Sequence, residues 1–174
     1  LAVSHVRHVN PLSQAFVESA SDVGLVQVND FNSPERHGLG YYHVTQKNGQ
    51  RCSAAKAYIA PVLTRKNLTI LTRTQVNKIL VKEGRAIGVQ VKQDHRVVDY
   101  LAAKEVLLCA GAINSPQLLM LSGIGPKAEL DKHNIPVVVA SPGVGKNLQD
   151  HLDVMIQNQG KTRDSYSVMP ALVP

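Results

Sequence analysis

The chain has 174 residues, of which 44% are hydrophobic and 18% charged, and its formal net charge is +6. This composition predicts a packed globular core and excludes wholesale disorder. The Lys and Arg residues are scattered and the chain has no Trp. Because a single-strand binder needs basic and aromatic residues interleaved on one platform, no nucleic acid is expected as a partner.

Targeting signals are absent from the sequence pattern. No apolar run approaches the ~20 residues that a membrane helix needs, and no secretory signal pattern opens the chain. The expected location is therefore cytoplasmic, or membrane-associated on the cytoplasmic side. The chain begins with Leu1 rather than Met, which fits an internal piece of a longer protein.

The two cysteines lie far apart in the sequence, without a CxxC pair. This arrangement predicts neither a zinc site nor a disulfide framework, so no metal ligand is expected. Cys109 ends an apolar run and is interpreted as a buried structural thiol.

Local elements can be predicted in chain order, beginning with the first 66 residues. A helix is expected over residues 11–18, capped by Asn10 or Ser13, with one apolar face formed by Leu12, Ala15, Phe16 and Ala20. Residues 41–46 predict a strand, and Asn48-Gly49 a tight turn. Residues 53–60 predict a short helix, which Ser53 caps and Pro61 discourages from continuing.

An antiparallel meander with one solvated face is the clearest pattern of the chain. Apolar residues alternate over residues 68–72 and 87–91, and apolar-rich segments also cover residues 76–82 and 96–100. Turns are expected at residues 83–85 and 93–95. Residues 106–109 then predict a strand that is buried on both faces.

The last third of the chain predicts shorter elements. A helix is expected from about Pro116, ending at Ser122-Gly123. A helical turn over residues 129–133 and a short strand over residues 137–140 follow, and residues 143–145 form a loop.

Small residues join the buried strand to this helix. Ala110, Gly111 and Ala112 let a backbone or ligand approach closely, and Asn114 or Ser115 can cap the helix. The free N–H groups of such a helix start attract anions, so the turn suits a nucleotide. Physical reasoning alone leaves open a second interpretation, in which the turn serves only packing.

Residues 111–125 are similar, without a gap, to the second signature of the glucose–methanol–choline (GMC) oxidoreductases. Three further segments resemble the family in the same order, namely residues 51–58, 67–72 and 143–152. The sequences of residues 104–112 and 147–151 are most similar to those of choline dehydrogenases and their bacterial relatives.

This resemblance implies an α+β fold class that includes a portion of an α/β FAD domain. An antiparallel β-meander and a buried strand–turn–helix would be flanked by pieces of a substrate domain. Residues 1–66 would belong to the substrate domain, residues 67–152 to the middle of the FAD-binding domain, and residues 153–174 to the return into the substrate domain.

FAD is the cofactor that the resemblance implies. Val76 matches the family position whose backbone meets the adenine, and Ala110 and Gly111 match small residues beside the nucleotide part of FAD. His151 matches a loop position and is expected to orient or support its neighbours. His37, His43 and His133 are interpreted as lone histidines without a ligand role.

The family's dinucleotide fingerprint, GxGxxG, is missing, because Gly143-Val144-Gly145 has no third glycine in register. Nothing resembles the family's C-terminal catalytic histidine with its partner, so no catalytic residue is assigned to this chain. The implied parent is an FAD-dependent alcohol dehydrogenase that oxidises a primary, choline-like alcohol to the aldehyde by hydride transfer. The isolated fragment should be inactive.

The expected partners of the parent are a small alcohol substrate and an electron acceptor, either oxygen or a quinone-like carrier. Severed sheet edges and unpartnered apolar faces also predict self-association of the fragment. The alternative interpretation is a non-catalytic binding or structural module that retains the family scaffold.

Overall fold

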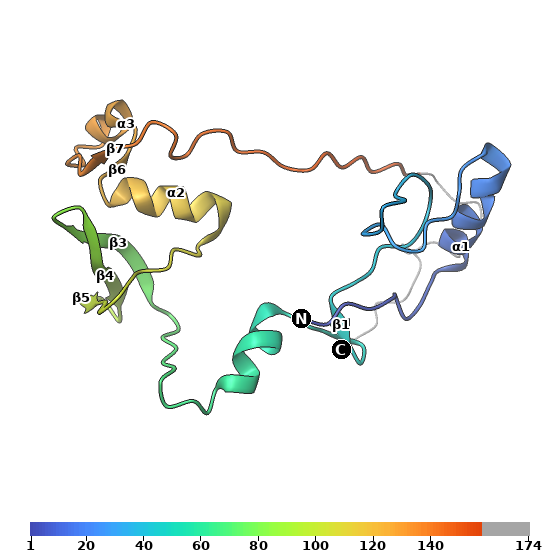
Figure 1. The fold of residues 1–174 in the computed structure, drawn as a ribbon, viewed down its shortest axis with the longest axis horizontal. Coiled ribbons are helices and arrows are strands. Elements are labelled where there is room, and N and C mark those ends of the chain that lie inside the picture. The colour runs from blue at the N-terminus through green and yellow to red at the C-terminus, as the bar shows by residue number, and fades with distance from the viewer. Residues whose placement is uncertain (158–174) are drawn as a thin grey trace. The chain divides into compact units, whose positions relative to one another are not determined.

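The computed structural model describes residues 1–157 (Figure 1). It divides into two compact units: one comprises Leu1–Thr69 with the described residues from Met155 onward, and the other Ile70–Val154. The boundaries expected after residues 66 and 152 fall close to these divisions. Whether the units are a substrate domain and an FAD domain stays a prediction, and residues 158–174 lie outside the described part.

Helix α1, Pro11–Glu18, begins as the sequence predicts. The Asn10 side chain accepts a hydrogen bond from the Leu12 N–H at 2.9 Å, and Pro11 occupies the first turn, where its missing N–H costs nothing. The predicted apolar face is wrong, because Leu12 and Phe16 are 46% and 63% exposed. Of the predicted face only Ala20, in the 3₁₀ turn η1, Ser19–Val23, is buried, and the buried residue of α1 itself is Val17.

The tight turn of the first unit is confirmed. Strands β1, Gln46–Lys47, and β2, Gln50–Arg51, pair antiparallel across Asn48 and Gly49, whose φ angles are 52° and 76°. Positive φ at both central residues is typical of the hairpin turn that Asn-Gly favours. The strand expected over residues 41–46 is wrong in length. Within residues 1–157, residues 41–45 make only one isolated bridge, between Ser4 and Val44, and the paired strand β1 begins at Gln46.

The helix expected over residues 53–60 forms, but not as a regular α-helix. Residues Ala55–Ile59 make a π-helical turn, η2, and Ala60–Val62 a 3₁₀ turn, η3. The Ser53 hydroxyl accepts a hydrogen bond from the Lys56 N–H at 3.3 Å, as a cap would. Pro61 lies inside η3 rather than after the helical segment, because a tighter turn tolerates its missing N–H.

The predicted meander is confirmed in the second unit. Strands β3, Gln75–Lys82, β4, Arg85–Gln93, and β5, Arg96–Leu101, pair antiparallel in that order. Positive φ angles at residues 83–84 and 94–95 make the two turns. Ile79 and Val91 are buried on this sheet, whereas every residue of β5 is exposed.

Two expected strands do not form. Residues 68–72 have no strand partner among the described residues, and their Leu68, Ile70 and Leu71 side chains are more than one third exposed. Residues 106–109 are also not a strand, and Leu107 is 75% exposed. A strand buried on both faces needs neighbours at both edges, and no described segment pairs with residues 106–109. The prediction of a buried Cys109 is therefore wrong as well, since this free thiol is exposed.

Helix α2, Gly111–Leu121, begins five residues earlier than the sequence pattern predicted. Its N-cap is Ala110, which offers no capping side chain, and the Ser115 hydroxyl accepts a hydrogen bond from the Ala110 N–H at 3.1 Å. Pro116 thus lies within the helix rather than in its first turn. Because proline has no backbone N–H, the Ala112 carbonyl receives no helical hydrogen bond from the residue four positions later. The end at Ser122-Gly123 is confirmed.

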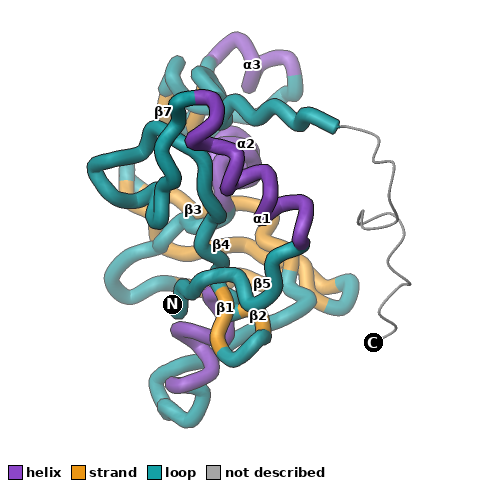
Figure 2. Tube along the Cα trace, turned by 90° about the vertical axis from the view of Figure 1, so that its right-hand side faces the viewer, coloured by secondary structure: helices purple, strands orange, loops and turns teal. Residues whose placement is uncertain are grey.

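Ser122 links the end of α2 to strand β3 through hydrogen bonds. Its buried hydroxyl donates a hydrogen bond to the Leu118 carbonyl at 2.6 Å and accepts one from the Ile79 N–H at 2.7 Å. Helix α2 contacts β3 (Figure 2) and also β6 (Figure 1). It is therefore the central element of the second unit.

A small parallel pair completes this unit. Strand β6, Ile124–Gly125, pairs with β7, Val139–Ala140, which is the second half of the strand expected over residues 137–140. Helix α3, Lys127–Lys132, lies between them in the sequence and covers the helical turn expected near residue 129. Its Leu130 is 1% exposed. Within residues 1–157, no helix has the length and apolar character required to cross a membrane.

Candidate cofactor site

The main candidate site is a cavity of about 600 Å³ between the sheet and α2, called the β3–α2 cavity below. Its volume falls in the range of about 300–1,000 Å³ that is usual for ligand pockets. The walls come from β3, β4, the extended segment before α2, and α2 itself. The lining residues are Gln75, Val76, Ile79, Val89, Val106, Leu107, Leu108, Cys109, Ala110, Asn114, Gln117, Leu118 and Leu121.

The structure brings two of the three predicted cofactor residues to this cavity. Val76, from β3, and Ala110, from the N-cap of α2, both line it, although they are 34 positions apart. Gly111 does not line the cavity and directly follows Ala110 as the first residue of α2. Its φ is +85°, and apart from its chain neighbours and the backbone of its own helix no described atom lies within 4 Å of the position that a Cβ would take.

Polar groups in the cavity are few. The Gln75 amide donates to the Val76 carbonyl at 3.2 Å and is therefore engaged. Asn114 and Gln117, both on α2, make no side-chain hydrogen bond within residues 1–157. The first N–H groups of α2 have no capping side chain, so they and the helix dipole favour negative charge at this end. The lining side chains are mostly apolar, and together with the polar backbone groups of the walls and these donors they suit a flat heteroaromatic ring that carries an anionic group.

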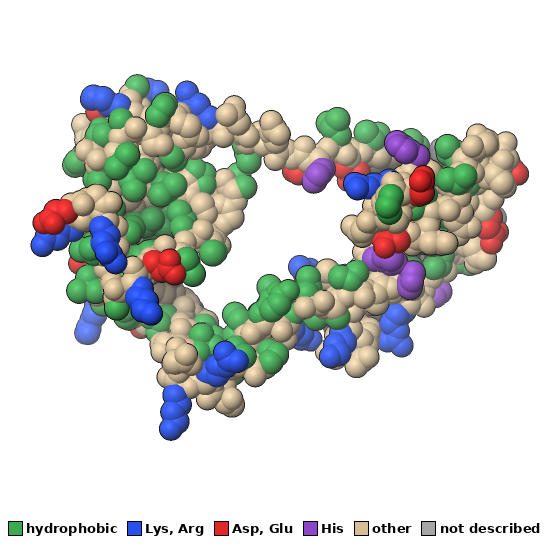
Figure 3. All heavy atoms as spheres, viewed as in Figure 1, with side chains coloured by type: hydrophobic (Ala, Val, Ile, Leu, Met, Phe, Trp, Pro, Cys, Tyr) green, Lys and Arg blue, Asp and Glu red, His purple; other side chains and the backbone are tan. Residues whose placement is uncertain are grey.

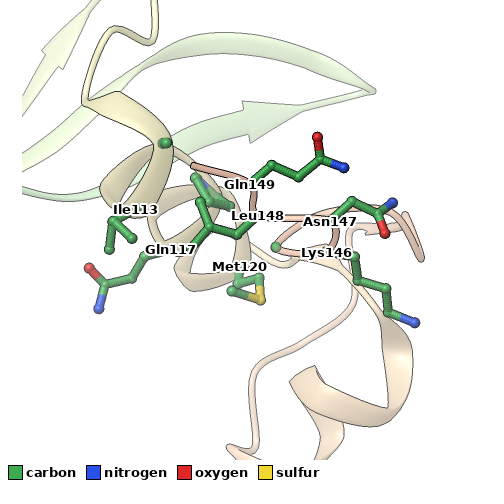
Figure 4. Close-up of a pocket in the computed structure, with 10 residues that line it drawn as sticks. Ile113, Gln117, Met120, Lys146, Asn147, Leu148 and Gln149 are labelled. Atoms are coloured by element: carbon green, nitrogen blue, oxygen red, sulfur yellow. The ribbon is translucent and has the colours of Figure 1, made fainter. Parts of the chain in front are cut away.

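A second cavity, of about 620 Å³, lies between α2 and the loop after β7. Figure 4 shows Ile113, Gln117 and Met120 projecting from α2, and the side chains of residues 146–149 arriving from the loop. Asn147 adopts a positive φ of 57° in this loop. The cavity thus involves the same helix as the β3–α2 cavity, with Gln117 in the lining of both.

His151 lines neither cavity. Its backbone N–H donates to the Asp150 carboxylate at 2.8 Å, and its side chain is exposed. An orienting role for this residue stays a prediction. Among residues 1–157, no group of three or more His, Cys, Asp and Glu side chains is placed to hold a metal ion.

Sequence reasoning missed a cluster in the first unit. His43 Nε2 lies 3.0 Å from His5 Nδ1, and His43 Nδ1 lies 3.5 Å from the Asp30 carboxylate. The two rings meet edge to face, with centroids 4.3 Å apart. His43 is therefore not a lone histidine. The single bridge between Ser4 and Val44 brings the rings together, and no sequence pattern announces such a bridge.

Asp30 is the acidic member of that cluster. Its pKa is lowered chiefly because its carboxylate accepts a hydrogen bond from the Asn32 backbone N–H, at 2.8 Å. Desolvation of the carboxylate opposes this and is the second-largest effect, while the Asn32 side-chain amide and then the two histidines lower the pKa further. His133 also has a partner, because its Nε2 lies 3.4 Å from the Glu129 carboxylate.

The chain has well-matched curated relatives. It is 43% identical over 176 residues to the alcohol dehydrogenase (acceptor) of Pseudomonas putida, covering all of this chain and 32% of the relative. It is also 43% identical over 159 residues to the oxygen-dependent choline dehydrogenase of Brucella anthropi, covering 91% and 29%. The chain thus spans about a third of the length of these curated relatives.

Solved structures give the same result. Pyridoxine 4-oxidase from Mesorbium loti superposes with a TM-score of 0.80 at 36% identity, over 86% of this chain and 30% of that protein. An FAD-dependent oxidoreductase from Chaetomium thermophilum superposes with a TM-score of 0.78 at 33% identity, over 85% and 26%. These likenesses confirm the predicted mixed α and β fold class. Because the model of the GMC oxidoreductase family matches residues 1–153, this chain belongs to the GMC oxidoreductases, whose cofactor is FAD.

Proposed function

We propose that this chain holds the nucleotide half of FAD in a parent protein that oxidises a primary alcohol to the aldehyde. The observation that carries the proposal is the shared cavity of Val76 and Ala110, which opens beside the uncapped start of α2. Two residues singled out for one ligand thus meet at one cavity of suitable size and polarity.

The residues of the β3–α2 cavity would each contribute through shape or hydrogen bonding. Val76 and Val89 from the sheet and Leu108 from the facing segment supply apolar surfaces that would hold a flat ring and exclude water. Asn114 and Gln117 would donate to or accept from its polar edge. The free N–H groups at the start of α2 would face negative charge.

Gly111 would leave room for the ligand. A φ of +85° at this position favours glycine, and the space where a side chain would lie is open within the described chain. When bound, FAD supplies the acceptor for hydride from the alcohol carbon. The chain's own residues bind and orient, and no proton transfer is assigned to any of them.

The choline-like substrate is the finer part of the proposal. One relative is by name a choline dehydrogenase that depends on oxygen, and another an alcohol dehydrogenase that uses an acceptor. We therefore propose a small alcohol as substrate and oxygen or a quinone-like carrier as electron acceptor. This chain has no Trp, so an aromatic cage for a quaternary ammonium group would come from other parts of the parent.

The cavity is tested in the parent protein by the ratio of bound flavin to protein. Gly111→Ala should lower this ratio, because the new methyl group enters the space beside the cavity and strains the backbone. Gly84→Ala is the matched control, since Gly84 also has a positive φ, 75°, and open space, but lies in the turn between β3 and β4. Equal loss of flavin in both variants would show that backbone strain alone is responsible.

The substrate is tested by adding choline and other primary alcohols to the oxygen-free parent and following its visible absorption. Bleaching by choline supports the choline-like proposal, and bleaching by other alcohols alone supports the oxidoreductase but not that substrate. A parent that takes up no FAD would favour the alternative, a binding or structural module without chemistry.

Self-association belongs to the same proposal. Strand β5 is exposed along its whole length, with Leu101 at 76%, and Leu107 in the following segment is 75% exposed. Such surfaces favour contact between copies of the isolated chain. A monomeric profile at high concentration in size-exclusion chromatography would contradict this expectation.

A further inference from the structure

Positively charged side chains surround the tight turn between β1 and β2 in the first unit. Lys47, Arg51 and Lys56 line a cavity of about 440 Å³, together with Asn48, Gln50 and Cys52. Figure 3 shows blue Lys and Arg side chains near the place where Figure 1 labels β1. This set of residues is called the hairpin cavity below.

A fourth cation lies on the same turn. A Cβ added at Gly49 would overlap Nη1 of Arg7, so the guanidinium of Arg7 rests against the backbone of the turn. The absence of a side chain at Gly49 thus permits two features at once. It allows the positive φ of the turn, and it admits Arg7 from a segment 42 positions earlier.

No carboxylate balances these charges in the part of the chain that the structure describes. The ion pairs of residues 1–157 involve His43, Lys127, Lys132 and His133, and none of the four cations at the turn. Within residues 1–157, the one hydrogen bond made by the side chains of these four cations goes to a neutral acceptor, from Lys56 Nζ to Gln50 Oε1 at 2.9 Å. Like charges are therefore held near one another, at an energetic cost that an anion would offset.

We propose that the hairpin cavity binds a phosphoryl group. A guanidinium presents paired donors that match the oxygens of phosphate, and lysines act as point charges beside it. Arg51 supplies the fork inside the cavity, Lys47 and Lys56 supply charge, and the Asn48 amide adds a neutral donor. The cavity has room for a tetrahedral anion and for part of a molecule attached to it.

This site is separate from the proposed cofactor cavity. None of its residues lines the β3–α2 cavity, and all of them belong to the first unit. The phosphoryl group could be carried by a soluble molecule or by an anionic lipid headgroup. Both sources share the chemistry that Arg51 and the lysines recognise, and the experiment distinguishes them.

The first arm titrates the ¹⁵N-labelled 174-residue chain with inorganic phosphate at constant ionic strength, with chloride as the balancing ion. Phosphate should shift the backbone amide signals of residues 47–56. Because Arg51→Gln removes charge-assisted hydrogen bonds to the anion, it should weaken phosphate binding about tenfold or more. Lys56→Gln is a second variant of an exposed side chain, and the amide spectrum of each variant shows whether it is folded.

Lys66→Gln is the matched control. It also removes one positive charge from an exposed residue of the first unit, but Lys66 does not line the hairpin cavity. It should leave phosphate binding unchanged. The proposal is overturned if phosphate shifts no signal in the hairpin and the lipid arm is also negative, or if Lys66→Gln weakens binding as much as Arg51→Gln does.

The second arm measures cosedimentation with vesicles of phosphatidylcholine alone or mixed with phosphatidylglycerol. Binding of free phosphate without vesicle binding indicates a soluble phosphorylated ligand. Binding only to the anionic vesicles, lost in Arg51→Gln and kept in Lys66→Gln, indicates a lipid headgroup. Vesicle binding that falls equally in both variants indicates diffuse attraction and overturns the proposal for that arm.

Discussion

Different interactions order the interior of each of the two units of this chain. The second unit is built on strand pairing, with β3, β4 and β5 in register over most of their lengths and α2 packed against β3. Among the described residues, the first unit has only two-residue strands and isolated bridges, and its order comes from a cap, a tight turn, single polar contacts and buried side chains such as Val17 and Val28. One family fold can therefore combine a part whose elements follow from periodic sequence patterns, the second unit, with a contact-driven part, the first unit, whose order depends on single contacts between residues distant in the sequence.

This comparison has a measurable consequence. Truncation of buried apolar side chains in the second unit should lower the free energy of unfolding the most, because the closely packed sheet and helices cannot easily shift to fill the space left behind. In the first unit, single polar groups should matter more than individual apolar side chains. Substitutions of Leu130, Ser122, Asn10 and Asp30 should show this contrast.

Leu130→Ala should have the largest effect. Leu130 in α3 is 1% exposed and lies near the space beside Gly125, so its truncation leaves a cavity in the second unit. Such truncations cost ~2–5 kcal/mol of unfolding free energy. Urea unfolding followed by the amide signals of residues 70–154 measures the loss. Leu107→Ala is the control, since that side chain is 75% exposed, and an equal loss there would contradict the assignment of the core.

Ser122→Ala should have the next largest effect. The substitution removes the acceptor of the Ile79 N–H at a buried position, and an unsatisfied buried group costs ~1–3 kcal/mol. The same urea experiment applies. Ser141→Ala is the control, because the Ser141 hydroxyl makes no hydrogen bond within residues 1–157. A neutral Ser122→Ala would mean that the link between α2 and β3 is not needed.

The contrast between the units also decides how much of the fold the sequence could predict. The meander was predictable because the alternation along β4 and the glycine-containing turn at Glu83-Gly84 both act over a few residues. The α1 start was predictable for the same reason, since Asn10 and Pro11 cap locally. That residues 106–109 form no strand was not predictable, because an apolar run predicts burial without showing whether a neighbouring strand is present.

The early start of α2 illustrates a second limit. Ala110, Gly111 and Ala112 were interpreted as a turn because small residues permit one, and Pro116 as a first-turn residue because prolines favour that place. In the structure the helix begins at Gly111 and tolerates Pro116 inside it. Tertiary contacts with β3 and β6 therefore outweigh the local preference.

The candidate sites were predictable to different degrees. Val76 and Ala110 were chosen from a resemblance, and the structure places them at one cavity. The pairing of His5 with His43, and the approach of Arg7 to Gly49, join segments about 40 residues apart through contacts that have no periodic signature. Such pairs are found only once the backbone path is known.

Asn10→Ala tests the contact-driven unit. Asn10 is 2% exposed and its side chain caps α1, so its removal should cost ~1 kcal/mol of unfolding free energy in the first unit. The amide signals of residues 1–69 report the loss. Asn10→Asp keeps an acceptor oxygen and should retain most of the stability. If both variants lose equally, the packing of the Asn10 side chain matters more than its cap.

Asp30→Asn should have the smallest effect, which is fully present above pH 3.8 and disappears in acid, where Asp30 of the unchanged chain is protonated as well. Because the folded-state pKa of Asp30 lies below its ordinary value of 3.8, ionised Asp30 stabilises the first unit above that value. This contribution is lost as the pH falls through the lowered pKa, so acid unfolding of residues 1–69 should be less steep in Asp30→Asn below pH 3.8. Asp22→Asn is the control, since the Asp22 carboxylate has no partner within residues 1–157. An acid profile unchanged in Asp30→Asn, with His5 and His43 still facing residue 30, would show that Asn32 and the histidines hold this loop without the charge of Asp30.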